Sequence, residues 1–334
     1  MPSRHFMIDS GKHYSSTRKY GIMALKFLVV IIIGILLYRQ VFYKKNVDEL
    51  YATFSDQFTS SGAVYLLIPF FVLMIINWML EAKRWQIITS YFKKYNLYDC
   101  LKMVIVGITF GVVTPSRIGE YGGRFYMMEP DHRWKAISGT LVGSIAQNIV
   151  TAMMGLLGAW YLYAYGSEIA AYITGSLFAI GIVGMLIGLY VYFNISGLER
   201  IINWLPEKIN KEKWRNQIHF LVDLRRRDQW RILAISVLRY LTYFTQYYLL
   251  IRFFGIDVSM LMALAIIALI LLIQSGLPLP PIIGFVARGE VALFLWGEIT
   301  ENALAILATT YGLWLINLVF PALCGLLLVL LHRD

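Results

Sequence analysis

Long runs of apolar residues, separated by short polar segments, make up most of the chain. A helix rises about 1.5 Å per residue, so roughly 20 apolar residues cross the hydrocarbon core of a bilayer. Runs close to this length cover residues 21–40, 62–82, 136–165, 169–193, 232–251, 258–277 and 302–331. The pattern predicts an all-α polytopic membrane protein with about seven or eight transmembrane segments in a single integral membrane domain over residues 1–334.

Two segments interrupt this pattern with helix-breaking residues. Residues 101–113 are apolar, but as a helix they would be roughly 20 Å long, short of a hydrocarbon core about 30 Å thick. The sequence TPSRIGEYGGR follows at residues 114–124, and a second break, QSGLPLPPIIG, covers residues 274–284. Broken backbone is tolerated at membrane depth only where protein or a water-filled cavity covers it. We therefore predict a re-entrant hairpin at 99–128 and a second broken-helix region at 258–298, which either re-enters or spans fully.

Two hairpins that enter from opposite sides would make the halves of the chain an inverted repeat. Many transporters place their substrate at the interface of such repeats, between broken helices. Each half contains a proline-containing break, an arginine and then a Gly-Glu pair, although hydropathy supports the comparison more than these residues do. The sequence leaves the repeat open as an interpretation.

Composition excludes most soluble classes of protein. Hydrophobic residues make up 58% and charged residues 15% of the chain, whereas soluble globular chains contain about 25% charged residues. A soluble enzyme, a secreted disulfide scaffold and a disordered regulator are therefore ruled out. The two cysteines lie in or beside apolar segments, and the five histidines are not spaced as metal ligands. We expect no disulfide framework, no metal and no cofactor.

The uneven distribution of basic residues predicts the orientation of the chain. The formal net charge is +10, and Lys and Arg are concentrated in residues 1–20, 83–98 and 194–231. The only basic residues in the loops expected on the opposite side are Lys44 and Lys45. By the positive-inside rule, the N-terminus faces the cytoplasm of a bacterial-type inner (plasma) membrane. No small-residue cleavage site follows the first apolar run, so we expect this helix to be retained.

The basic segment 194–231 is predicted to be a cytoplasmic amphipathic loop. Its apolar residues recur at helical spacing, with arginines elsewhere around the wheel. Such a helix suits the surface of the inner leaflet, where it would contact anionic phospholipids. Nucleic acid binding is the weaker interpretation, because a basic juxtamembrane segment already has an explanation in lipid contact.

Charged residues in the two breaks are the candidates for function. Arg117, Glu120 and Arg124 are spaced by three and four residues, so on a helix they share one face. Charges at membrane depth are costly, and they usually line a cavity or pair with one another. Arginine can hold a phosphate with two parallel hydrogen bonds. The predicted substrate-binding residues, facing an anionic lipid headgroup, are Arg117, Gly119, Glu120, Arg124, Arg288 and Glu290.

Two further interpretations of the breaks stay open. Free backbone N–H groups of Gly119, Gly122 and Gly123 could add an anion-binding nest. Alternatively, Arg117–Glu120 and Arg288–Glu290 are ion pairs that only hold the hairpins together.

Other polar residues have simpler explanations. Trp85 with Asn77, Glu81 and Arg84 is typical of an interfacial belt at the cytoplasmic end of the helix at 62–82. An interhelical hydrogen bond is the favoured role of Gln147. Aromatic packing is favoured over a polar face for Arg239, Tyr240, Tyr243, Gln246, Tyr247 and Tyr248. No Ser/His/Asp constellation, metal-ligand spacing or phosphate-binding glycine loop is present, so we do not expect an enzyme.

The segment TPSRIGE at 114–120, with Arg124 after it, resembles the signature of the lysylphosphatidylglycerol synthase transmembrane (flippase-like) family. The residues around Asn77, Arg84 and Trp85 are similar to it as well, and so is the late proline-rich break. This break departs from the family pattern, because five residues separate Gly284 from Glu290. The resemblance covers roughly residues 20–330 and implies a helical bundle with re-entrant elements that moves a lipid between leaflets.

The resemblance also limits the expected activity. In full-length synthases a soluble aminoacyl transferase follows the membrane part, and we expect no such domain in this chain. The prediction is a stand-alone, flippase-like transporter of an anionic or phosphate-bearing lipid (a phospholipid or a polyprenyl phosphate), with a homo-oligomer left open. The alternative is a membrane-embedded transferase, or accessory subunit, that acts on polyprenyl-linked sugars.

Overall fold

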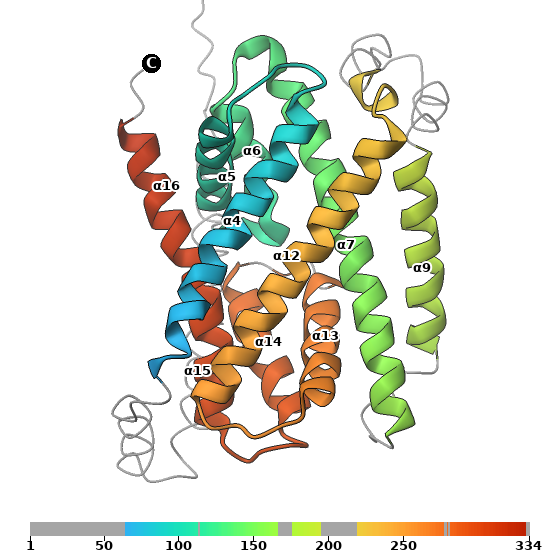
Figure 1. The fold of residues 1–334 in the computed structure, drawn as a ribbon, viewed down its shortest axis with the longest axis vertical. Helices are drawn as coiled ribbons and strands as arrows, with labels where there is room; N and C mark the ends of the chain where they lie inside the picture. Colours follow the sequence, from blue (N-terminus) through green and yellow to red (C-terminus); the bar gives the residue numbers. More distant parts are fainter. Residues whose placement is uncertain are drawn as a thin grey trace, which may run out of the picture. The chain divides into compact units, whose positions relative to one another are not determined.

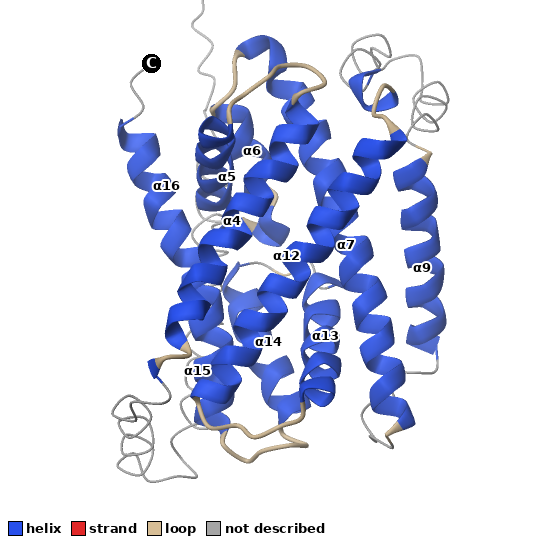
Figure 2. Cartoon of the chain, viewed as in Figure 1, coloured by secondary structure: helices blue, strands red, loops and turns tan. Residues whose placement is uncertain are grey.

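The computed structural model describes residues 64–112, 114–165, 176–194, 219–276, 279 and 281–331, all within the unit Thr53–Asp334. The predicted helix at 21–40, the basic N-terminus at 1–20 and most of the 194–231 loop lie outside these residues. The described residues form helices joined by short loops, with no strand among them (Figure 2). This architecture agrees with the predicted all-α fold.

The α-helices of the described residues are α4 (Leu67–Thr89), α5 (Leu97–Val112), α6 (Gly119–Tyr126), α7 (Arg133–Ala164), α9 (Ser176–Phe193), α12 (Arg226–Phe253), α13 (Met260–Gly276), α14 (Pro281–Trp296), α15 (Ala303–Trp314) and α16 (Phe320–Leu331). Short 3-10 turns cover Pro115–Arg117 and Pro130–His132, and a π-helical segment, Leu315–Val319, joins α15 to α16. Two stretches, Pro130–Ala164 and Ala303–Leu331, are long and apolar enough to cross a membrane.

Helices α4 and α12 are longer than their apolar runs predict. α4 continues past residue 82 to Thr89, and α12 begins at Arg226 instead of residue 232. The two helices pack against each other, and polar contacts join them near both ends. Gln246 donates a hydrogen bond to the carbonyl of Phe70 (3.0 Å), and Tyr91, just past α4, donates to Asp228 (2.6 Å). This packing extends both helices through polar residues that do not belong to an apolar run.

Helices α5 and α6 form a helical hairpin whose arms begin and end at the same end of the unit (Figure 1). At the turn, the N–H of Gly119 donates to the hydroxyl of Thr114 (2.7 Å), and Arg117 has a left-handed φ of 58°. The arms approach closely, because a Cβ on Gly119 would lie 2.0 Å from the carbonyl oxygen of Phe110. Glycine at this position therefore allows the chain to turn back on itself.

Helices α13 and α14 form a second hairpin, which begins and ends at the opposite end of the unit (Figure 1). Gly255, with a φ of 74°, lies in the turn that leads from α12 into α13. α14 returns and packs against α15, where a Cβ on Gly289 would lie 2.3 Å from the hydroxyl oxygen of Tyr311. The inner ends of the two hairpins therefore point towards each other near the middle of the unit.

Equivalent contacts hold the two hairpins. α7 packs on α13, where a Cβ on Gly158 would lie 2.7 Å from the carbonyl oxygen of Ala265. α16 packs on α5, where a Cβ on Gly325 would lie 2.6 Å from the carbonyl oxygen of Ile105. In each pair, an outer helix of one half touches the first arm of the hairpin from the other half.

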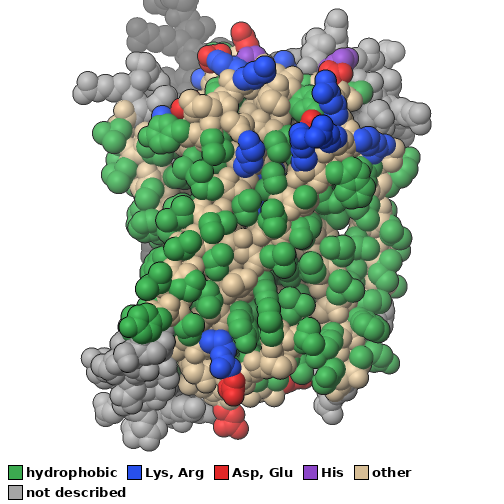
Figure 3. Space-filling model, viewed as in Figure 1, with side chains coloured by type: hydrophobic (Ala, Val, Ile, Leu, Met, Phe, Trp, Pro, Cys, Tyr) green, Lys and Arg blue, Asp and Glu red, His purple; other side chains and the backbone are tan. Residues whose placement is uncertain are grey.

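The sides and ends of the unit differ in polarity. Large hydrophobic side chains cover most of the side of the unit that Figure 3 shows. Trp160 and Leu327, for example, are each 60% exposed. Lys and Arg gather at the end formed by the loops at 90–96 and 127–132, and this is also the end that α16 reaches (Figures 1 and 3). The opposite end, with the loops at 254–259 and 297–302, has Arg252 paired with Asp257, and Glu298 and Glu301 nearby in sequence.

The glycine contacts predict which substitutions the fold tolerates. Gly158→Ala and Gly325→Ala should each lower the free energy of unfolding by about 1–3 kcal/mol, because the new methyl group overpacks a helix contact. Thermal unfolding in detergent measures this loss. Gly184→Ala on α9 is the matched control, since no atom lies within 4 Å of the added Cβ. Equal unfolding temperatures for all three variants would contradict the packing described.

Candidate functional site

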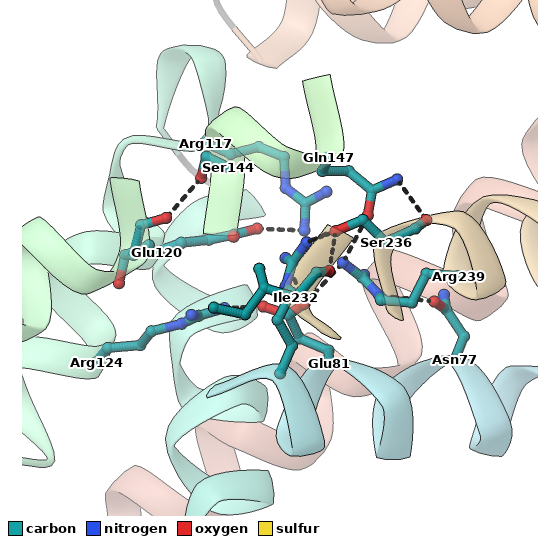
Figure 4. A network of polar contacts seen from close by, with 12 residues as sticks. Asn77, Glu81, Arg117, Glu120, Arg124, Ser144, Gln147, Ile232, Ser236 and Arg239 are labelled. Carbon is teal, nitrogen blue, oxygen red and sulfur yellow. Dashed lines mark hydrogen bonds and ion pairs between the residues drawn. The ribbon is translucent and has the colours of Figure 1, made fainter. Parts of the chain in front are cut away.

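A buried carboxylate with three arginines forms the centre of the unit (Figure 4). Glu81 of α4 places one oxygen 2.5 Å from Arg124 of α6. Its other oxygen lies 2.5 Å from Arg84 of α4 and 2.7 Å from Arg239 of α12. Glu81, Arg84 and Arg124 are each only 5% exposed. One carboxylate thus joins α4, the first hairpin and α12.

Neutral side chains fix the orientation of these arginines. Arg84 donates to the hydroxyl of Ser236 (2.9 Å) and to the side-chain oxygen of Gln147 (3.3 Å). Arg239 donates to the same oxygen of Gln147 (3.2 Å), which confirms the predicted interhelical hydrogen bond of this residue. The guanidinium of Arg124 lies over the ring of Trp85, 4.7 Å from the ring centroid. These contacts hold the buried guanidinium groups in place, while Nε of Arg124 has no hydrogen-bond partner among the described residues.

The network reaches the last long helix through two asparagines. Arg239 donates to the side-chain oxygen of Asn77 (3.1 Å), and Asn77 donates to the side-chain oxygen of Asn317 (3.3 Å). Asn317 lies in the π-helical segment between α15 and α16 and is 8% exposed. Pro321 follows within one turn and has no N–H for a helical hydrogen bond. The irregular helical turn thus places the side chain of Asn317 where it contacts Asn77, which in turn binds Arg239.

Arg117 and Glu120 form an ion pair at the turn of the first hairpin. The side chain of Arg117 is 47% exposed and that of Glu120 is 17% exposed. Gly111 of α5 makes room for the acid, because a Cβ there would lie 2.6 Å from Cγ of Glu120. Arg117 is therefore accessible to solvent, in contrast to the buried Arg84 and Arg124.

Arg288 and Glu290 do not form the ion pair considered from the sequence. They are two positions apart on α14, so they point to different sides of the helix, and no salt bridge joins them among the residues that the structure describes. Glu290 is exposed, whereas Arg288 is partly buried. The second hairpin thus carries a partly buried arginine with no salt bridge among the described residues.

The cluster as a whole carries excess positive charge. Figure 4 shows the ion pair of Arg117 and Glu120 beside the buried centre. The arginines of the cluster are Arg84, Arg117, Arg124 and Arg239, and the acids are Glu81 and Glu120. With every group ionised, four arginines and two acids leave a net charge of +2.

The structure corrects several interpretations of the sequence. The interfacial belt was wrong, since Asn77, Glu81, Arg84 and Trp85 are all buried in the centre of the unit. The signal in the sequence for this buried site was a Glu and an Arg three positions apart at the end of an apolar run. The predicted residues Arg117, Glu120 and Arg124 do come together in the cluster, whereas no ion pair or hydrogen bond joins Arg288 or Glu290 to it among the described residues.

The glycines of the first hairpin serve packing. The N–H of Gly119 is not free for an anion, because Thr114 accepts it. Gly123 lies within α6, where an added Cβ would be 2.6 Å from the carbonyl oxygen of Val106. Among the described residues, no group of three or more His, Cys, Asp or Glu is placed to hold a metal ion. Arginine side chains are therefore the groups of this site that can bind an anion.

The buried carboxylate predicts a large effect on stability. Glu81→Gln should lower the free energy of unfolding by about 3–5 kcal/mol, because it leaves buried guanidinium groups without their counter-charge. Unfolding by SDS in mixed micelles measures the loss, and adding Arg239→Gln should restore part of it. Glu129→Gln, at a surface ion pair, is the control and should leave the unfolding transition nearly unchanged. A Glu81→Gln protein as stable as wild type would contradict a charged centre.

Comparison with protein families matches residues 23–325 to the lysylphosphatidylglycerol synthase TM region. No curated protein matches the chain. The family match covers most of the sequence, including both hairpins and every residue of the arginine cluster. The chain is therefore a membrane protein that belongs to the family of the lysylphosphatidylglycerol synthase transmembrane region.

Proposed function

We propose that this protein transfers an anionic, phosphate-bearing lipid between the two leaflets of a membrane. The family points to a membrane lipid-related function. The observation that carries the finer proposal is the net positive cluster that joins the first hairpin to α4 and α12. Charges inside a membrane are expensive and are usually retained for function. A headgroup phosphate is the anion that such a cluster could neutralise.

Both hairpins are proposed to be re-entrant. The α5–α6 arms start and end at the basic end of the unit, and the α13–α14 arms start and end at the other (Figures 1 and 3). Their irregular inner ends would then lie near the bilayer midplane, where backbone must be covered by protein or face a water-filled cavity. Contacts of α7 and α16 with the first arms supply part of this cover.

The inverted arrangement supports alternating access. Arg117 and Glu120 lie on the hairpin from the basic end, and Arg288 lies on the hairpin from the other end. Rocking of one half against the other would expose the arginines first to one leaflet and then to the other. The buried group around Glu81 lies between the halves and would keep α4 and α12 joined during this movement.

The positive-inside rule predicts the orientation of this arrangement. The end with the loops at 90–96 and 127–132 should face the cytoplasm, and the end with the loop at 254–259 should face outwards. Single cysteines at Lys94 and at Asp257, in a background with Cys100→Ala and Cys324→Ala, report this in intact cells. A membrane-impermeant maleimide should label the Asp257 position only. Labelling at Lys94, with Asp257 protected, would reverse the orientation.

Vesicles containing the purified protein test the transport itself. Fluorescent phosphatidic acid and phosphatidylglycerol should become accessible to external dithionite at least about ten times faster than in protein-free vesicles, a barrier difference of about 1.4 kcal/mol. Arg117→Gln should remove most of this acceleration, because the accessible arginine of the cluster is lost.

Arg252→Gln is the matched control for this assay. Arg252 is also an accessible, ion-paired arginine, but it lies at the far end of the unit. It should leave the rate unchanged. Wild-type vesicles that move no anionic lipid faster than empty vesicles would contradict the proposed function.

A further inference from the structure

We propose that the anionic lipid headgroup reaches Arg117 along the line where α6 lies against α7, which we term the α6–α7 junction. This inference rests on the proposed function and names the residues that the headgroup passes. None of them is fully buried. They are Tyr121, Gly122 and Phe125 of α6, and Arg133, Trp134, Ser144 and Asn148 of α7.

Asn148 is an exposed amide in the middle of a membrane span. It belongs to the stretch Pro130–Ala164, which is long and apolar enough to cross a membrane. Trp134 and Trp160, 45% and 60% exposed, lie in opposite directions from Asn148, each about 20 Å along the helix at a rise of about 1.5 Å per residue. Exposed tryptophans are typical of the two membrane interfaces, so Asn148 lies near the bilayer midplane. Its side chain has no hydrogen bond among the described residues, and an amide without a partner is unfavourable in hydrocarbon.

A contact between α6 and α7 connects Asn148 to the first hairpin. Ser144 lies one helical turn before Asn148 on the same face of α7. The hydroxyl of Tyr121 on α6 donates to the hydroxyl of Ser144 (3.3 Å). Tyr121 follows Arg117 by four residues, and Figure 4 shows Arg117 beside Glu120 and the buried centre. Polar side chains therefore extend from the middle of α7 to the accessible guanidinium group.

A basic and aromatic group lies at the other end of the junction. The guanidinium of Arg133 lies over the ring of Phe125, 5.4 Å from the ring centroid, and donates to the carbonyl of Met128 (3.1 Å). Phe125 makes an edge contact with Trp134, with 5.9 Å between ring centroids. No acid pairs with Arg133 among the described residues. An unpaired arginine beside an interfacial tryptophan is suited to attract an anionic headgroup from the leaflet.

Gly122 leaves space beside α6 between these two ends. An added Cβ at Gly122 would have no atom within 4 Å, in contrast to the tight contacts of Gly119 and Gly123. It is exposed, and it lies next to Tyr121 and three residues before Phe125, the residues of α6 that contact α7. Glycine inside a helix is unfavourable, and packing does not explain it at this position. The open surface at Gly122 is where a passing headgroup has room.

The chemistry of the junction fits a lipid better than a second copy of the chain. The acyl chains of a lipid stay in hydrocarbon, so its headgroup moves along a protein surface that is open to the bilayer. The junction has Arg133 at one end, Arg117 at the other, and hydroxyl and amide groups between them. This charge complements an anionic headgroup. Two copies packed through the same face would bring like charges together.

Polar accessibility at Asn148 tests the path without measuring transport. Nitroxides are attached at Asn148→Cys and, as a control, at Ile187→Cys of α9, in the same cysteine-free background. Both positions are exposed, and their depths match because a Cβ on Gly188 would lie 3.4 Å from Ile149. In phosphatidylglycerol vesicles, a water-soluble nickel complex should collide with the Asn148 nitroxide at least about ten times more often, because polar solutes avoid hydrocarbon.

Two results of this experiment would overturn the path. One is an equally low collision rate at Asn148 and Ile187, which would place both in hydrocarbon. The other is strong spin–spin coupling between the Asn148 nitroxides of two molecules, which would assign this face to a second copy of the chain.

Filling the junction tests passage along it. Gly122→Trp should fold, because the space around it is open, and should slow the transport of fluorescent phosphatidylglycerol at least about tenfold, a barrier difference of about 1.4 kcal/mol. Gly184→Trp on α9 is the matched control, since an added Cβ there also meets no atom within 4 Å, and it should keep the wild-type rate. Thermal unfolding confirms that both variants are folded.

A folded Gly122→Trp protein that transports at the wild-type rate would overturn the path. Transport by the wild type in the same experiment would still support the proposed function, so the two ideas fail separately.

Discussion

Glu81 is a carboxylate buried among three guanidinium groups, and the arrangement of the helices depends on it. Its two oxygens bind Arg84, Arg124 and Arg239, which lie on α4, α6 and α12. Burying these charges has a high desolvation cost, which only close pairing and further hydrogen bonds can offset. Gln147, Ser236 and Asn77 supply those hydrogen bonds. These contacts hold the side chains of the centre in place and leave it with a net positive charge.

Glycines at close helix contacts and prolines at helix breaks determine where the exposed arginines lie in the fold. Without the close approach at Gly119, the chain could not turn after α5, and Arg117 would not lie beside the buried centre. The second hairpin brings Arg288 from the opposite end, and Gly158 and Gly325 let the outer helices brace both hairpins. Packing of small residues between helices is the usual means of close association in membranes. The same contacts that stabilise the fold thus bring charges from distant parts of the chain together.

Hydropathy and helix breaks predicted much of this structure from the sequence. The breaks at 114–124 and 274–284, and the arginines and glutamates around them, were visible because they interrupt apolar runs. Glu81, Arg84 and Arg239 were assigned to an interface or to aromatic packing, because their depth follows from the helix extension to Thr89 and from the pairing of α4 with α12. The missing partner of Arg288 depends on which way each side chain of α14 points. Tertiary packing decides both, and residue spacing alone does not.

The most direct test of a lipid phosphate at this cluster is an experimental structure of the protein in nanodiscs that contain phosphatidic acid. A lipid phosphate bound at the cluster predicts density within hydrogen-bonding distance of Arg117, with the ion pair between Arg117 and Glu120 opened. Headgroup density confined to the two membrane interfaces, with that ion pair intact and the arginines empty, would contradict it.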